Sequence, residues 1–309
     1  MAVQENMKTM VSRMRAYLAH RRALGFRLRS EGYLLLSFGR YADRVKPGGL
    51  LTRKLAITWA SLPKDAGRHS WARRLEAVRR LAKHLAIEEP RTEIPPRHLF
   101  GPAQRKFRPF IYTLGQINQL MRAAGQLPGE LQPRTYQTLI GLLACTGLRV
   151  SEALHLKVAD VDLQRGLLLV RAGKFQQTRW VPLHPTALKP LLAYARRRQQ
   201  LFPLAEYFFT SDRGTAPAYS TVHFTFSKLR KVIAHEGRPP RIHDLRHYHA
   251  CRTLQRWQLS RQGAQNRVLI LSRYLGHRHI RHTYWYFHAL PELMANAGKR
   301  FENHTHEKC

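Results

Sequence analysis

The chain has 309 residues, and its 53 Lys and Arg residues against 19 Asp and Glu residues give a formal net charge of +34. This length predicts two domains, and a hydrophobic content of 44% is enough for ordinary buried cores, which excludes a disordered chain. The charge favours a nucleic acid as partner, because Lys and Arg side chains neutralise backbone phosphates. A membrane surface would instead call for one basic amphipathic segment, whereas positive charge extends over this whole chain.

The cysteines and the apolar stretches of the sequence predict the cellular compartment of the protein. Cys145, Cys251 and Cys309 are an odd and widely spaced set, which argues against a disulfide framework or a zinc module and for a reducing environment. The N-terminus lacks the apolar core of a secretory signal, and the longest apolar stretch, residues 139–148, is too short to span a bilayer. We therefore expect a soluble, bacterial-type cytoplasmic protein that associates with the nucleoid.

The first part of the chain predicts a bundle of basic helices. Apolar residues at helical spacing predict helices over residues 5–24, 30–45, 55–62 and 68–87. Thr52 is suited to cap the third helix, because its hydroxyl can accept a hydrogen bond from a free backbone N–H group. We expect these helices to form an N-terminal DNA-binding domain over residues 1–95.

A proline-rich segment follows. Residues 88–110 contain five prolines and several basic residues, and helices do not continue through such a composition. We expect a linker here, with residues 96–105 between the two domains, and its positive charge would suit a crossing over a phosphate backbone.

The second domain, expected over residues 106–309, combines helices with a small sheet. Residues 161–174 and 178–185 resemble two strands joined by a tight basic turn. The fold class is therefore mainly α with a small antiparallel β-sheet. Helices are predicted over 113–125, 133–147, 147–156, 185–200, 221–237, 241–257 and 266–301, the last with a break at Gly276.

Five short segments of this domain occur in a particular order. They contain Arg149 in TGLRVSEAL, Lys174 in AGKFQQTRWVPL, His243 and Arg246 in HDLRH, His277 in LGH and, nine residues later, Tyr286. In this order and spacing the chain resembles the tyrosine recombinase family of the phage-integrase type. Motifs carry the resemblance over residues 110–290, while residues 1–90 match only in size and helical content.

The resemblance implies a site-specific recombinase or integrase. Such an enzyme cleaves and rejoins double-stranded DNA through a 3′-phosphotyrosyl intermediate, without metal, ATP or other cofactor. It also implies two domains that close around a recombination site, and a homotetramer that exchanges strands between two sites. The basic chain and its unusual hairpin favour an enzyme encoded by a mobile element.

The residue types fit this chemistry independently. Strand transfer needs a nucleophile, positive charge for a pentavalent phosphorane and an acid for the leaving 5′-oxygen. Arg149 and Arg246 suit the charge role, because a guanidinium presents permanently charged donors to two phosphate oxygens. His277 would add a further donor, and Lys174 suits the acid role. His243, three residues before Arg246, would share a helical face with it and serve in proton handling or phosphate orientation.

Two residues near these motifs have secondary roles. Glu152, three residues after Arg149, is expected to support the site without reacting. The family hairpin reads G-K-G-x-K-x-R, whereas this chain has G-K-F-Q-Q-T-R, so Phe175 replaces a glycine. Lys174 remains the expected acid, because no other lysine lies between the two predicted strands.

The choice of nucleophile depends on the geometry after Gly276. On one unbroken helix, residues seven apart share a face and residues nine apart do not, which would pair His277 with Tyr284. The family spacing selects Tyr286 and requires the helix to start afresh between Gly276 and Thr283, with Thr283 as a suitable cap. We predict Tyr286 as the nucleophile and keep Tyr284 as the alternative.

Other activities remain to be separated by experiment. His279, His282 and His288 lack the carboxylate or cysteine that would complete a metal site, so we expect no metal. A type IB topoisomerase-like enzyme would use the same chemistry to relax DNA without sequence preference. A binding protein without activity would recognise a site yet form no covalent adduct, and a metal-dependent nuclease would lose activity in EDTA.

Overall fold

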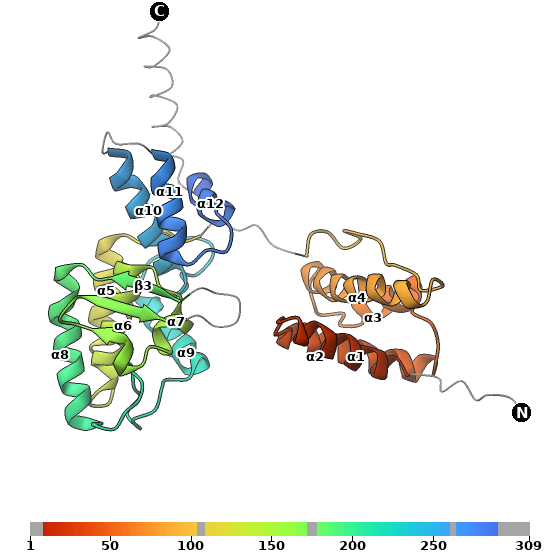
Figure 1. Cartoon of the computed structure of the whole chain (residues 1–309), viewed down its shortest axis with the longest axis horizontal. Helices are drawn as coiled ribbons and strands as arrows, with labels where there is room; N and C mark the ends of the chain where they lie inside the picture. The colour runs from red at the N-terminus through yellow and green to blue at the C-terminus, as the bar shows by residue number, and fades with distance from the viewer. Residues whose placement is uncertain (1–8, 104–108, 172–177, 260–263, 290–309) are drawn as a thin grey trace, which may run out of the picture. The chain divides into compact units, whose positions relative to one another are not determined.

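The computed structural model describes residues 9–103, 109–171, 178–259 and 264–289. The chain forms two compact units, residues 1–107 and 108–309, each with a hydrophobic core of its own (Figure 1). Among the described helices, none combines the length and the apolar character that a membrane span requires.

The described part of the N-terminal unit is a helical bundle, as predicted. Thr52 caps the third helix, since its hydroxyl accepts a hydrogen bond from the Leu55 N–H group at 3.2 Å. Phe38 and Trp59 are fully buried in the core and meet edge to face, with ring centroids 5.3 Å apart. The helices are α1 (Met10–Ala23), α2 (Arg29–Val45), α3 (Arg53–Ser61) and α4 (Arg68–Glu88).

After α4 ends at Glu88, the described part of the proline-rich segment has no helix or strand, but it packs on the N-terminal unit. The Glu93 N–H group donates to the carbonyl of Leu51 at 3.0 Å, and the Glu93 carboxylate accepts from the Arg53 N–H group at 2.8 Å. Further along, Phe100 lies edge to face against Trp71, with ring centroids 5.5 Å apart. The expected linker is therefore attached to the first unit at least as far as Phe100.

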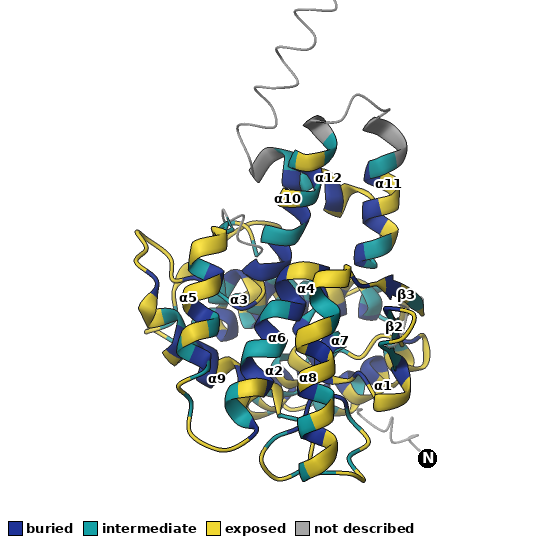
Figure 2. Cartoon of the chain, turned by 90° about the vertical axis from the view of Figure 1, so that its left-hand side faces the viewer, coloured by how far each residue is buried: buried dark blue, intermediate teal, exposed yellow. Residues whose placement is uncertain are grey.

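The C-terminal unit is mostly helical around a small sheet. Helix α8 (Pro185–Leu201), for example, has one buried and one exposed face (Figure 2). This arrangement confirms the predicted fold class. The elements are α5 (Leu114–Ala124), α6 (Gln132–Thr146), α7 (Val150–Leu154), η1 (Val158–Asp160), β1 (Val161–Asp162), β2 (Leu167–Val170), β3 (Arg179–Pro182), α8 (Pro185–Leu201), α9 (Tyr219–Leu229), η2 (Arg230–Val232), α10 (Asp244–Leu259), α11 (Ala264–Leu275) and α12 (Arg281–Ala289).

The sheet is antiparallel in the order β1-β2-β3. The sequence predicted one strand over residues 161–174, whereas the structure has two short strands there, separated by a turn in which Gly166 adopts φ +66°. A glycine permits this reversal because it has no Cβ atom to clash in the left-handed region. Val170 of β2 pairs with Arg179 of β3, so these two strands flank the segment that carries Lys174.

The last three helices form a layer of their own. In both views α10, α11 and α12 lie together at one end of the C-terminal unit (Figures 1 and 2). Their shared core contains Ala250, Cys251, Leu254, Leu271, Leu275 and Tyr286. One of the two candidate tyrosines is thus part of a hydrophobic cluster.

Candidate active site

The site is built around the turn that ends α6. Gly147 is the C-cap of this helix with φ +64°, and its carbonyl group is an acceptor in the site. A Cβ atom at this position would lie 2.8 Å from the His249 ring and 2.9 Å from the Leu275 side chain. Only glycine fits this backbone conformation and this space, so the TGLR motif places Arg149 directly after a tightly packed turn.

Arg149 is the N-cap of α7, and two nitrogen atoms of its guanidinium group are held by protein acceptors. Its Nη1 atom donates to Glu152 Oε1 at 2.7 Å, and its Nη2 atom donates to the carbonyl of Gly276 at 3.0 Å. The backbone N–H group of Arg149 donates to the other carboxylate oxygen at 2.9 Å. Glu152 supports the arginine as expected, because one carboxylate fixes both its backbone and its side chain.

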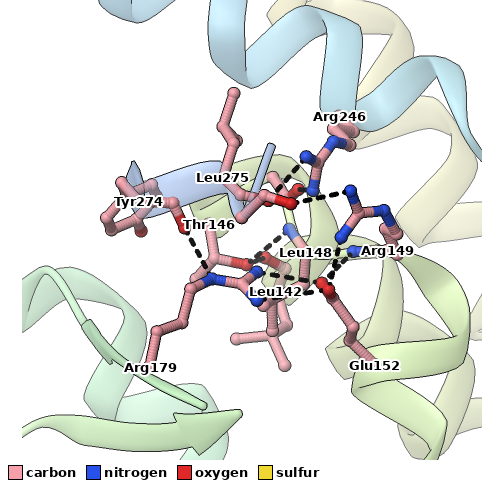
Figure 3. Close-up of polar contacts among 11 residues, drawn as sticks. Leu142, Thr146, Leu148, Arg149, Glu152, Arg179, Arg246, Tyr274 and Leu275 are labelled. Atoms are coloured by element: carbon pink, nitrogen blue, oxygen red, sulfur yellow. Dashed lines mark hydrogen bonds and ion pairs between the residues drawn. The ribbon is translucent and has the colours of Figure 1, made fainter. Parts of the chain in front are cut away.

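Arg246 reaches the same turn from α10 and is 2% exposed. Its guanidinium group donates to the carbonyls of Gly147 at 2.8 Å and Leu275 at 2.6 Å. Burial and the nearby charge of Arg149 lower the pKa of Arg246 to about 10, so it remains charged at neutral pH. Figure 3 shows both guanidinium groups between the end of α11 and the start of α7.

A third arginine, which the sequence analysis did not single out, completes this group. Arg179 donates through Nε to the carbonyl of Tyr274 at 2.7 Å and pairs with both oxygens of Glu152 at 3.2 and 3.0 Å. The signal for it was the arginine that closes the family hairpin pattern G-K-G-x-K-x-R, which this chain retains.

The arginine group carries more charge than its carboxylate partner neutralises. Arg149, Arg179 and Arg246 bring three positive charges. Within the described ranges Glu152, which pairs with Arg149 and Arg179, is the one carboxylate ion-paired with this group, which leaves 3 − 1 = +2. Burial raises the pKa of Glu152, but hydrogen bonds from Arg179 and Arg149 outweigh it and keep the group ionised. Such a site suits a phosphate group, whose oxygens accept charge-assisted hydrogen bonds.

His277 follows the break between α11 and α12. Gly276 adopts φ +66°, and the helix starts afresh at Arg281, as the choice of Tyr286 required. The expected cap is wrong, because Thr283 lies inside α12 and is fully buried. Its hydroxyl group instead pairs with His277 Nδ1 at 2.8 Å. Burial and the charges of Arg246 and Arg149 lower the pKa of His277 to about 3, so the ring is neutral.

The two candidate tyrosines differ in surroundings. Tyr286 is 2% exposed, and its ring stacks on that of His277 with centroids 6.2 Å apart. Burial raises the pKa of Tyr286, while the charge of Arg246 and its hydrogen bond to the phenol act in the opposite direction. Tyr284 is 48% exposed and packs against Phe287. Of the two phenols, only that of Tyr286 lies at the arginine group.

His243 lies at the edge of the site. It is the residue immediately before α10, exposed to solvent, and its ring meets that of His247 edge to face at 5.1 Å. His247 in turn contacts the ring of Tyr286 at 5.5 Å. Burial lowers the pKa of His247 to about 3, so this intervening ring is neutral.

The structure thus brings Arg149, Arg246, His277 and Tyr286 together, with His243 one ring away. Lys174 lies outside the described residues.

The comparisons with known proteins agree with this site. The profile described as the phage integrase family matches residues 112–292. An integrase/recombinase of Sinorhizobium fredii, y4rB, is 37% identical over 314 residues, covering 98% of this chain and 100% of that protein. The tyrosine recombinase XerD of Rhizobium meliloti is 31% identical over 73% of this chain and 71% of its own.

Solved structures show the same fold. The integrase of the transposon Tn1549, in complex with transposon right-end DNA, matches with a TM-score of 0.71 and 15% identity over 94% of this chain and 99% of that chain. The XerH recombinase bound to a palindromic difH substrate matches with a TM-score of 0.67 and 14% identity over 98% of both chains. The chain belongs to the phage integrase family of tyrosine recombinases.

Proposed function

We propose that this protein is a site-specific recombinase that joins itself to DNA through Tyr286. The observation that carries the proposal is the position of this phenol, buried beside Arg246 and stacked on His277, with Arg149 held at the same turn. A nucleophile and a concentration of positive charge are what phosphoryl transfer requires.

In the cleavage step, the phenolic oxygen of Tyr286 attacks the phosphorus of a DNA phosphodiester. The bond between phosphorus and the 5′-oxygen breaks, the phenol loses its proton, and the 5′-oxygen gains one to become a free hydroxyl group. A 3′-phosphotyrosyl bond remains. Rejoining is the reverse reaction with a 5′-hydroxyl group as nucleophile, so the phosphodiester is conserved and no ATP is needed.

The remaining residues have complementary roles in this proposal. Arg149 and Arg246 bind the phosphate oxygens and stabilise the phosphorane. His277, neutral and with Nδ1 paired to Thr283, donates from Nε2 when the threonine hydroxyl is the donor of that pair. Lys174 protonates the leaving oxygen. His243 contributes to proton handling at the edge of the site.

The partner in this proposal is a double-stranded recombination site. The N-terminal bundle supplies the second half of a clamp around the duplex, and four protomers act on two sites in the nucleoid. The net charge of +34 supports a DNA partner. A lambda integrase tetramer bound to a Holliday junction, with a TM-score of 0.62 to this chain, is an assembly of this kind.

We also propose a mobile-element origin. The strongly basic chain and the hairpin with Phe175 in place of a glycine support it. The DNA that flanks the gene is then the first place to search for the site, and duplexes from it that the protein binds serve as substrates below.

The decisive experiment uses a nicked suicide duplex from this flanking DNA. The wild-type protein is expected to form an adduct that survives SDS and disappears on proteolysis. Tyr286→Phe should abolish the adduct and Tyr284→Phe should retain it. An adduct that persists in Tyr286→Phe refutes the assignment. Specific binding by the wild-type protein without any adduct would identify a binding protein, and relaxation of plasmids that lack the site would identify a topoisomerase-like enzyme.

A further inference from the structure

Arg179 connects segments that are distant in the sequence. It is the first residue of β3, pairs with Val170 and has a side chain that is 10% exposed. Each nitrogen of its guanidinium group has a protein acceptor: Nε binds the carbonyl of Tyr274, and Nη1 and Nη2 bind the two oxygens of Glu152 (Figure 3). A two-pronged contact of this kind fixes the orientation of both partners.

Through Glu152, this contact reaches Arg149. The carboxylate is 7% exposed and binds the side chain of Arg149 at 2.7 Å and its backbone N–H group at 2.9 Å. Without Arg179, one side of the carboxylate would lose both its hydrogen bonds and its counter-charge. The carboxylate could then turn, and Arg149 with it.

Through Tyr274, the contact reaches the turn before His277. The carbonyls that follow, of Leu275 and Gly276, accept hydrogen bonds from Arg246 and Arg149. A Cβ atom on Gly276 would lie 2.7 Å from Arg179 Nη1, so the guanidinium group fills the space beneath this turn. Arg179 therefore contacts both the support of Arg149 and the backbone that carries the acceptors.

We propose that Arg179 is a positioning residue of the recombinase, an inference that rests on the proposed function. It keeps Glu152 and the turn at Gly276 in place, so that Arg149, Arg246 and His277 address the same phosphate. Its own charge is paired with a buried carboxylate, and its three nitrogens are occupied, so it acts through other residues and not on the DNA. Its loss should slow the chemical step without weakening DNA binding.

The test compares Arg179→Gln and Arg179→Lys with Arg165→Gln. Arg165 belongs to the same sheet region, is 81% exposed and provides the same loss of charge away from the site. Two quantities are measured: the dissociation constant on the intact duplex, and the single-turnover rate of adduct formation on the nicked suicide duplex at saturating protein. Thermal melting checks folding, and Arg179→Lys, which keeps the charge and the alkyl stem, replaces Arg179→Gln if that variant does not fold.

We expect both Arg179 variants to form adducts about 10- to 100-fold more slowly, with a dissociation constant like that of Arg165→Gln. A lysine does not restore the rate, because its ammonium group is a single point donor and lacks the planar fork that spans the Tyr274 carbonyl and both Glu152 oxygens. A rate equal to that of Arg165→Gln overturns the inference, and so does a loss confined to DNA affinity. The proposed function fails separately, if the wild-type protein forms no adduct.

A double variant tests the route of action. Glu152→Gln removes the carboxylate that Arg179 holds, so the double variant with Arg179→Gln should be no more than about threefold slower than the slower single variant. Effects that multiply would mean that the two residues act independently, which overturns the proposed coupling.

Discussion

Replacing Gly276 by alanine tests how tightly the turn and the arginine group are packed. Gly276 adopts φ +66°, and a Cβ atom added to it would lie only 2.7 Å from Arg179 Nη1. A left-handed conformation costs a residue with a Cβ atom about 1–2 kcal/mol. The contact with Arg179 comes in addition, and displacing this side chain sacrifices charge-assisted hydrogen bonds of about 1.5–3 kcal/mol. We therefore expect Gly276→Ala to lower the free energy of unfolding by about 2.5–5 kcal/mol in total.

Gly237 offers a matched control. It adopts φ +72° in the same unit, but a Cβ atom there would have no heavy atom within 4 Å. Gly237→Ala should therefore cost only the conformational part, about 1–2 kcal/mol, and leave adduct formation unchanged. In Gly276→Ala the displaced Arg179 hydrogen bonds are lost as well. If their loss raises the activation free energy of cleavage by the same amount, adduct formation slows about 10- to 100-fold. Urea unfolding and single-turnover cleavage measure the two effects, and equal results for the two variants would refute the packing argument.

Two further predictions concern His277 and His247. Thr283→Val removes the hydroxyl group that pairs with His277 Nδ1. Adduct formation should therefore slow about fivefold, which is the equivalent of one net hydrogen bond. Thr283→Ser keeps the hydroxyl group and should keep the wild-type rate, so a slower serine variant would contradict the prediction. His247 has a pKa near 3 in the folded protein against 6.5 for an ordinary histidine, so the unfolded chain takes up the proton first as the pH falls. The contribution of His247 to the free energy of unfolding is complete above pH 6.5 and is lost towards pH 3, with a loss of about 2 kcal/mol between pH 7 and 5. Urea unfolding at these two pH values should show this loss in the wild-type protein and a smaller loss in His247→Gln. An equal loss in the variant would rule out His247 as its source.

Much of the fold follows from local signals in the sequence. Helical spacing, the cap at Thr52 and the helix break at Gly276 act within one or two turns, so the sequence alone locates these elements. The prediction merged β1 and β2 into one strand and missed the turn at Gly166 between them, although these strands pair locally, Val161 with Leu168. The packing of Phe100 on Trp71 was not predicted, because it depends on a partner elsewhere in the chain. Periodicity carries no information about such contacts.

The same distinction applies to the site. The motifs pointed to Arg149, Arg246, His277 and Tyr286, and the structure places these four side chains together. The residues that hold these four side chains in place were harder to predict from the sequence. Arg179 acts over 95 residues to reach Tyr274, and the Thr283 hydroxyl group turns back six residues to His277. Threonine near a helix start usually caps it, so the local rule gave the wrong partner for Thr283.

The way these arginines are held explains how the site can stay charged before DNA binds. Arg246 is anchored by two backbone carbonyls, of Gly147 and Leu275, and Arg149 by a carbonyl and one shared carboxylate. Carbonyl dipoles satisfy the N–H groups and fix their directions without cancelling the charge, whereas a carboxylate for each arginine would leave no net attraction for a phosphate. The acceptors are available because two helices end at glycines with positive φ, which turn their last carbonyls towards the guanidinium groups. Backbone geometry at these two helix ends therefore determines the electrostatics of the site. Substitutions of Gly147 or Gly276 should reduce the rate of adduct formation as strongly as substitution of Glu152, the side-chain partner of Arg149 and Arg179.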